Sequence, residues 1–208
     1  MIAVNQEARV RAALAGTSEA GERPLVDLQL PALIQKAVAK TLSTLQPAAV
    51  LVPLVRRPHE LTVLLTRRAD TLRSHRGQIS FPGGRRDAED LSFADCALRE
   101  AFEEVGLPPE NVEVLGYLDD YPTITRFRVT PVVGLVTPPR DFKFDAVEVA
   151  EVFEVPLALF LEAECFTRKT FTHDGLNVPF FEVNHGPYRI WGATAGMLWD
   201  FCQKVSAR

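Results

Sequence analysis

Three glutamates in one stretch of the chain have the spacing of a metal site. Glu100, Glu103 and Glu104 stand at positions i, i+3 and i+4, so on a helix their carboxylates share one face. Like charges this close repel one another, and a helix gains no stability from them. A divalent cation converts that repulsion into binding, and carboxylate oxygens suit Mg²⁺ or Mn²⁺ beside substrate phosphates. The spacing favours metal-assisted chemistry on a phosphate ester or anhydride, against the alternative of a solvated acidic helix face.

A basic segment directly precedes these acids. Residues 67–86 contain six arginines and one acid, whereas residues 87–104 contain seven acids and one arginine, Arg99. Guanidinium groups form paired hydrogen bonds with phosphate oxygens. The order of the charges therefore predicts an anion-binding segment that leads into a cation-binding one. The alternative is a pair of solvated charged faces.

The totals exclude several classes of protein. The chain of 208 residues suffices for one sizeable domain or a domain with an arm. Its net charge of −4 gives no support to a nucleic-acid partner. It has no run of about 18 apolar residues, so we expect no membrane partner. The three cysteines form no CxxC pair, which argues against a disulfide framework or a zinc site. We expect a reducing, cytoplasmic location, and the alanine-rich residues 1–20 leave an organellar address open.

The glutamates need a helix to position them, and the sequence predicts one over residues 93–105. Ser92 with Asp95 three residues later resembles a capping box, with Asp in place of Glu. Gly106 is a natural C-terminal residue, and the prolines at 108–109 end the helix. The apolar face that this helix would turn to the core consists of Ala94, Ala97, Leu98, Ala101 and Val105.

The rest of the chain alternates between strand and helix patterns. We expect strands at residues 48–55, 61–66, 78–81, 112–117, 128–136, 166–171 and 178–183, with a hairpin-like turn at 56–59 and a tight turn at 82–84. We expect helices at residues 6–14, 33–45, 156–161 and 193–204, and a linker at 21–31. This mixture predicts a layered α/β or α+β domain at 46–208. Residues 1–45 would form a helical N-terminal arm.

Two segments resemble a known family. Residues 99–107, R-E-A-F-E-E-V-G-L, look like the second half of the Nudix box, G-x5-E-x7-R-E-U-x-E-E-x-G-U, where U is a bulky apolar residue. The first half departs from it, because Asp90 replaces the glutamate and eight residues separate it from Arg99. Residues 64–69, Arg73, Gly77 and the F-P-G-G at 81–84 resemble L-L-T-x-R-S/A-x3-R-x3-G-x3-F-P-G-G, the pattern of the coenzyme A pyrophosphatase branch. That branch shares the longer spacing and the aspartate.

The resemblance covers roughly residues 48–204, with further matches at residues 128–134, 148–157 and 190–194. It implies an α/β/α sandwich with a mixed central sheet and a loop-helix-loop box. It also implies metal-dependent hydrolysis of coenzyme A and its derivatives to 4′-phosphopantetheine and adenosine 3′,5′-bisphosphate. Mg²⁺ or Mn²⁺ would be held by Glu100, Glu103 and Glu104, and the resemblance adds the carbonyl of Gly84. By the same resemblance, Arg99 orients a glutamate through charge-assisted hydrogen bonds.

The basic segment supplies the candidate substrate contacts. Arg68 and Arg73 suit the phosphates of coenzyme A, against the alternative of a solvated basic loop. His75 and Gln78 could bond the substrate, or could serve only the structure. Gly83, like Gly84, permits a close backbone approach or simply a tight turn.

The general base is less determined. Glu100 is one candidate, although a metal ligand that also acts as base must balance two roles. Glu148 or Glu151, in a predicted loop before residues 153–156, is another, against the alternative of a solvated acidic loop. Asp90 would anchor the box loop or cap the helix.

For three further residues we favour a packing role over a catalytic or binding one. Cys96 suits helix packing, because no Cys–His signature accompanies it. Trp191 and Phe127 could stack on adenine, but core packing is the commoner role.

Other functions stay open at this stage. ADP-ribose, NADH, another dinucleotide or a nucleoside triphosphate could replace coenzyme A as the substrate. A nucleotide sensor without turnover would usually have lost box carboxylates, which this chain retains. The amphipathic spacing of residues 1–45 suggests a homodimer contact. A decapping role ranks low, because no broad basic patch extends beyond the substrate segment.

Overall fold

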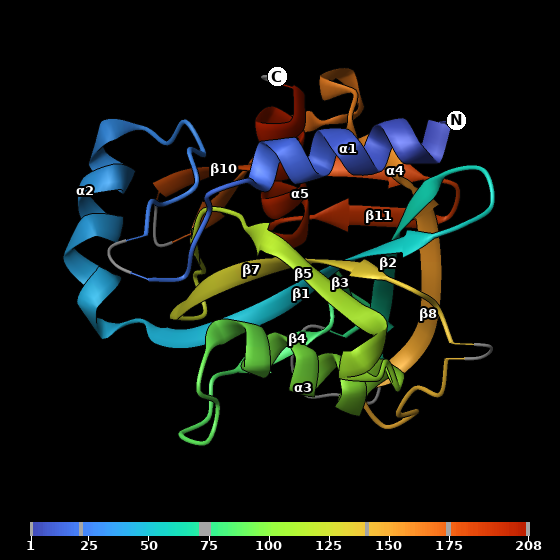
Figure 1. The fold of residues 1–208 in the computed structure, drawn as a ribbon. Coiled ribbons are helices and arrows are strands. Elements are labelled where there is room, and N and C mark those ends of the chain that lie inside the picture. The colour runs from blue at the N-terminus through green and yellow to red at the C-terminus, as the bar shows by residue number, and fades with distance from the viewer. Residues whose placement is uncertain (1, 21–22, 71–75, 140–141, 174–175, 207–208) are drawn as a thin grey trace.

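The computed structural model describes residues 2–20, 23–70, 76–139, 142–173 and 176–206. Its central sheet contains β1 (Gln46–Arg56), β2 (Leu61–Arg68), β3 (Ile79–Ser80), β5 (Val112–Tyr117) and β7 (Phe127–Val136), in the order β3-β2-β1-β7-β5 (Figure 1). Three more strands join it, since β4 (Gly83–Arg85) pairs with β1, β6 (Tyr121–Pro122) with β7, and β8 (Val149–Pro156) with β2. β1 and β7 are parallel, and their other partners are antiparallel, so the sheet is mixed.

Helices cover both faces of this sheet. α3 (Phe93–Val105) lies on one face, and α1 (Ile2–Leu14) and α5 (Ala193–Ser206) lie on the other (Figure 1). Side chains alternate along the strands, so Leu64 joins the core under α3 while Val63 and Leu65 join the core on the opposite face. The predicted α/β/α sandwich around a mixed sheet is confirmed.

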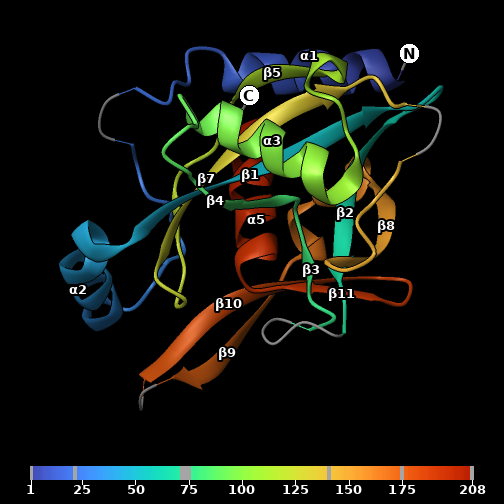
Figure 2. The same ribbon diagram turned by 90° about the horizontal axis from the view of Figure 1, so that it is seen from below.

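A second, smaller sheet flanks α5. It consists of β9 (Thr167–His173), β10 (Leu176–His185) and β11 (Tyr188–Trp191), all antiparallel, with β10 in the middle. The β9–β10 hairpin projects from the body of the molecule (Figure 2). The short helix α4 (Leu157–Phe160) precedes this sheet, and the 3-10 turns η2 (Pro109–Asn111) and η3 (Ala163–Cys165) lie in connections.

Most predicted elements are present within a few residues of their expected bounds. The strands expected at 48–55, 61–66, 112–117 and 128–136 are confirmed as β1, β2, β5 and β7. The helix expected at 33–45 is shorter, because α2 (Ala32–Thr41) is followed by a 3-10 turn, η1 (Leu42–Thr44). Four strands were not expected. β4 lies where a turn was predicted, β8 includes most of the predicted acidic loop, and β6 and β11 had no counterpart.

The box helix has the predicted limits. Ser92 has extended backbone angles, and its Oγ accepts the Asp95 N–H at 2.9 Å, which satisfies one free donor of the first turn. Gly106 has a φ of 64°, and its N–H donates to the Phe102 carbonyl. Glycine adopts this left-handed angle without a steric penalty, so the helix ends there.

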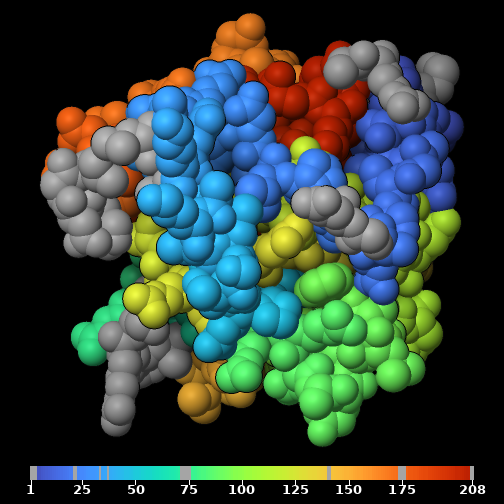
Figure 3. All heavy atoms as spheres, turned by 90° about the vertical axis from the view of Figure 1, so that its left-hand side faces the viewer, coloured from blue at the N-terminus to red at the C-terminus, as the bar shows by residue number. Residues whose placement is uncertain are grey.

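The N-terminal segment packs on the larger core. Val10 and Leu14 of α1 are buried. Further along, Arg23 is also buried, and its Nε donates to Asp120 Oδ1 at 2.7 Å. α2 and its flanking segments spread over one face of the molecule (Figure 3). Among the described residues, no helix is long and apolar enough to cross a membrane.

Candidate active site

The two glycines before the box bring β4 against both the sheet and α3. A Cβ on Gly83 would clash with the Ala49 carbonyl of β1, and one on Gly84 would lie 2.5 Å from the Glu100 carboxyl carbon. Ordinary side chains cannot occupy those spaces. The Gly84 backbone and the Glu100 carboxylate are therefore in direct contact, which is the arrangement that a shared cation would require.

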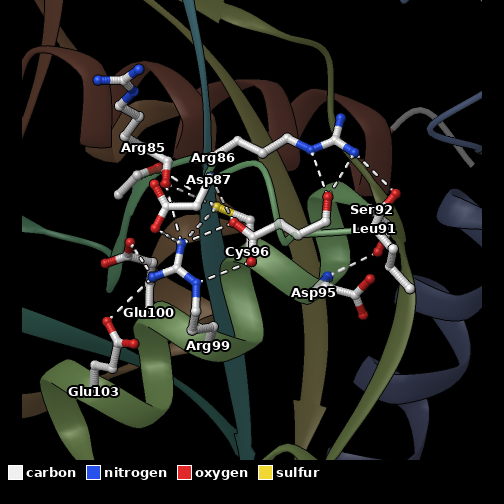
Figure 4. Close-up of polar contacts among 12 residues, drawn as sticks. Arg85, Arg86, Asp87, Leu91, Ser92, Asp95, Cys96, Arg99, Glu100 and Glu103 are labelled. Atoms are coloured by element: carbon white, nitrogen blue, oxygen red, sulfur yellow. Dashed lines mark hydrogen bonds and ion pairs between the residues drawn. The ribbon is translucent and has the colours of Figure 1, made fainter.

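Arg99 organises the acids around it (Figure 4). Its Nε and Nη2 donate to the two oxygens of Asp90 at 3.0 and 2.9 Å, a bidentate pair. Its Nη1 donates to Glu100 at 2.8 Å and to Glu103 at 3.2 Å. The guanidinium thus fixes the position of Glu100 from one side, which agrees with the orienting role implied by the resemblance.

Asp90 anchors the box loop. It is buried, and besides Arg99 it accepts the Asp87 N–H at 2.8 Å. The hydrogen bonds from Arg99 lower its pKa to about 2. The helix cap is Ser92, so of the two roles left open for Asp90 the structure selects the anchor.

Glu104 is the most deeply buried of the three box glutamates. Its residue is 5% exposed, and its pKa is raised to about 7, mainly because burial penalises the charged form. The Gly83 N–H donates to it, and Arg68 of β2 lies 3.8 Å away, Nη1 to Oε1. Burial also raises the pKa of Glu100, although the Arg99 hydrogen bond opposes this. Glu103 is 57% exposed at its side chain and lies at the rim.

The carboxylates are not arranged as a finished metal cage. Within the described ranges, no group of three or more His, Cys, Asp and Glu side chains is placed to hold a metal ion. The donor set still suits a divalent cation. Glu104 is buried, and its cationic partner among the described residues, Arg68, lies 3.8 Å away. Glu100 contacts the Gly84 backbone. A cation here would compete with Arg99 for Glu100 and with Arg68 for Glu104.

The two candidate bases outside the box differ in position. Glu148 precedes Val149, the register partner of Arg68, and its carbonyl accepts the Ala69 N–H at 2.9 Å, so it lies at the end of β2 next to Arg68. After burial, its charge is a minor further cause of the raised pKa of Glu100 and Glu104. Glu151 instead pairs with Arg67 across β8 and β2, accepts the Tyr188 hydroxyl at 2.6 Å, and has a lowered pKa. A carboxylate held by two donors is a poor base, which leaves Glu148 as the better-placed one.

The structure locates part of the expected substrate set. Arg68 lies beside the box, its backbone N–H donates to the Gln78 carbonyl at 2.9 Å, and Gly83 donates to Glu104. Arg73 and His75 lie outside the described residues. The sequence reasoning missed the pairing of Arg68 with Glu104. Strand alternation could have found it, because Leu64 and Arg68 lie four residues apart on β2 and so share the α3 face.

The remaining candidates have surroundings that can be described. Cys96 is buried in α3, and burial raises the pKa of its thiol to about 12, so it is a packing residue. Phe127 is partly buried against the larger core. Trp191 packs edge-to-face with Phe180, with ring centroids 5.8 Å apart, and Arg189 lies over its ring.

Comparison with known proteins gives one consistent family. Residues 45–173 match the NUDIX domain. The chain is 40% identical over 176 residues to the Nudix hydrolase NudL of Cronobacter sakazakii, covering 85% of this chain and 91% of that protein. It is 43% identical over 168 residues to NudL of Pectobacterium atrosepticum, covering 77% and 83%. Among solved structures, the Nudix hydrolase RenU of M. smegmatis has a TM-score of 0.47 at 26% identity and covers 55% of this chain and 72% of its own.

Proposed function

The chain belongs to the Nudix family, and we propose that it is a pyrophosphatase that hydrolyses coenzyme A and its derivatives with Mg²⁺ or Mn²⁺. One observation carries the substrate assignment. Arg68, in the segment that resembles the coenzyme A branch, lies 3.8 Å from Glu104 of the box. This distance supports the proposal, because a guanidinium that could bind phosphate and a buried carboxylate that could bind the cation would then act at one site, as cleavage of a pyrophosphate requires.

Four groups are proposed to hold the cation. They are the carboxylates of Glu100, Glu103 and Glu104 and the carbonyl of Gly84. A bound Mg²⁺ or Mn²⁺ would neutralise charge on the pyrophosphate and make water a better nucleophile. Arg99 positions Glu100 and Glu103, and Asp90 positions Arg99 in turn. This chain of contacts lets a rigid loop determine where the carboxylates point.

Glu148 is the proposed general base. Water would add its oxygen to one phosphorus of the pyrophosphate while Glu148 takes its proton, and the bond from that phosphorus to the bridging oxygen would break. The products are 4′-phosphopantetheine and adenosine 3′,5′-bisphosphate. Support for Glu148 comes from its place beside Arg68 at the end of β2, where its carbonyl accepts the Ala69 N–H, and from its minor electrostatic effect on Glu100 and Glu104.

The substrate contacts are proposed along β2 and the segment that follows it. Arg68 would bind phosphate oxygens, Gly83 would allow a close backbone approach, and Gln78 would provide a polar contact. Arg73 and His75, which the structure does not describe, complete the set expected from the sequence. The same metal chemistry would also serve ADP-ribose or NADH, so the substrate needs a direct test.

Mass-resolved product analysis tests the proposal. Purified protein would be incubated with Mg²⁺ or Mn²⁺ and, separately, coenzyme A, its 3′-dephospho form, ADP-ribose and NADH. We expect the two products named above from coenzyme A, and slower cleavage of the 3′-dephospho form. Glu104→Gln should slow the reaction severely, whereas substitution of Glu182, a buried glutamate away from the box, by Gln should leave the rate unchanged. Cleavage of ADP-ribose or NADH but not coenzyme A would reject the substrate, and nucleotide binding without cleavage would indicate a sensor.

A further inference from the structure

Arg68 has an unusual hydrogen-bonding state for its position. Its Nε is buried, and among the side chains that the structure describes it is the one buried nitrogen or oxygen without a hydrogen-bond partner. Its backbone is fixed, because its N–H donates to Gln78 and its carbonyl accepts the Gly77 N–H at 3.2 Å. A buried donor without an acceptor is destabilising. Such a group calls for an explanation, and a ligand that completes the bond is one.

The charge of Glu104, the partner of Arg68, is also incompletely balanced. Glu104 is buried, and within the described part of the chain Arg68 is the one cationic side chain paired with it. The distance of 3.8 Å exceeds that of a hydrogen bond, so the pair is a loose one. The acids Glu100 and Glu148 also act on Glu104. A buried carboxylate in such company needs a counter-ion, and Arg68 supplies it without being optimally placed.

By contrast, the neighbouring arginine on the same strand has a hydrogen-bond partner for its Nε. Arg67 points to the other face of β2, where its Nε donates to Glu151 at 3.1 Å and its Nη1 lies 3.6 Å from Asp70. The guanidinium groups of the two adjacent arginines therefore differ in their hydrogen bonds, although the residues belong to the same strand. Arg67 has the contacts of a structural residue, and Arg68 those of a residue with two alternative partners.

We propose that Arg68 is an exchangeable counter-ion that couples metal binding to substrate binding. Without metal, its guanidinium neutralises Glu104. A divalent cation at Glu104 repels the guanidinium and replaces it, and the free guanidinium, Nε included, then donates to the phosphate oxygens of the substrate. This inference rests on the proposed metal site and makes the affinities for metal and phosphate mutually dependent.

Binding measurements on Arg68→Gln test the exchange without turnover. Mn²⁺ affinity, measured by electron paramagnetic resonance without nucleotide, should increase about tenfold in the variant, within the usual range for coupled sites. ADP affinity, measured by calorimetry, should fall in the variant when Mn²⁺ is saturating and stay unchanged in EDTA. Arg67→Gln should match the wild type in both measurements. Arg68→Lys keeps the positive charge that competes with the metal, so its Mn²⁺ affinity should stay near that of the wild type. This variant provides a second test if Arg68→Gln does not fold.

Two results would overturn the exchange. One is Mn²⁺ affinity in Arg68→Gln that is unchanged or weaker. The other is an equal loss of ADP affinity with and without metal, because a fixed phosphate contact predicts that result. If coenzyme A is not the substrate, the Mn²⁺ measurement still stands, since it involves no nucleotide. Failure of the proposed substrate and failure of the exchange are therefore distinguishable.

Discussion

Two buried glutamates in this protein have opposite electrostatic states. Glu182, in the small sheet, is 2% exposed and accepts hydrogen bonds from Lys169, Arg189 and Asn184, which lower its pKa to about 2. Glu104, in the box helix, is 5% exposed, and its pKa is raised to about 7. Among the residues that the structure describes, its partners are the loosely paired Arg68 and the Gly83 N–H. Burial alone does not separate these residues, but their partners do.

The difference shows how a structural carboxylate can be told from one that awaits a ligand. Within the described part of the chain, the three side chains that donate to Glu182 come from its own sheet, so its charge is balanced within the protein. The negative charge of Glu104 is not fully neutralised by its partners, and the charges of Glu100 and Glu148 add to the repulsion. A buried carboxylate with a raised pKa beside other acids is a candidate for function.

The largest expected effect is on activity when Glu104 becomes Gln. We expect kcat/KM to fall on the order of 10³-fold, or about 4 kcal/mol, because a cation ligand is lost. The free energy of unfolding should not decrease, because a neutral amide relieves the burial of a poorly paired charge. Activity assays and denaturant titration would check both parts. An active or strongly destabilised variant would break the contrast with Glu182.

Asp90→Asn should produce the next largest effect. Asp90 belongs to the box but is paired as fully as Glu182, so it should combine both behaviours. We expect about a tenfold loss of kcat/KM, because Arg99 is no longer held against Glu100. Stability should also fall, by about 1–2 kcal/mol. Weaker Mn²⁺ binding in the variant would show that the activity loss acts through the position of Arg99. If the variant loses stability but keeps its activity, Asp90 has a role in folding and none in positioning Arg99 for catalysis.

Glu182→Gln should affect stability alone. We expect unfolding to become easier by about 1–2 kcal/mol, since Lys169 and Arg189 lose a charged acceptor but remain partly solvated. The activity of the folded enzyme should match the wild type. Chemical denaturation and kinetics at a temperature well below unfolding would test the two parts. A large loss of activity per folded molecule would contradict the structural role.

The smallest effect is a dependence of stability on pH in metal-free protein. The raised pKa of Glu104 favours the protonated form in the folded state, so its stabilising contribution is complete below pH about 4.5 and is lost as pH rises through about 7. Compared with Glu104→Gln, wild type should therefore lose about 1 kcal/mol between pH 6 and 8. Glu182, with its lowered pKa, should act only in acid, between pH about 4.5 and about 2. Denaturant titrations at several pH values would give the free energy of unfolding against pH for both proteins. Parallel curves for wild type and Glu104→Gln would argue against the raised pKa.

The box was more predictable from sequence than its surroundings, because its signals are local. Ser92 and Gly106 set the ends of α3, and the glutamate spacing set its polar face. Contacts between distant segments carried no such signal. The donors of Glu182 lie 13 and 7 residues from it in sequence, on strands whose register was unknown. The sequence predicts a loop before residues 153–156, whereas pairing with β2 extends the strand β8 back to Val149.

β4 shows a second limit. Its glycines have low strand propensity and predict a turn, yet they pair with Ala49 and Val50 of β1 because only glycine fits between β1 and Glu100. Tertiary packing overrides local preference there. The same close packing places Glu100 and Glu104 beside the glycine backbone, which no spacing rule could show.

Mn²⁺ binding to Glu104→Gln and Glu182→Gln, measured side by side by electron paramagnetic resonance, tests the central claim most directly. If incomplete pairing marks the metal site, Glu104→Gln should lose at least about tenfold in Mn²⁺ affinity while Glu182→Gln binds like wild type. Equal affinity in wild type and Glu104→Gln, or an equal loss in both variants, would contradict the assignment of Glu104 as a metal ligand.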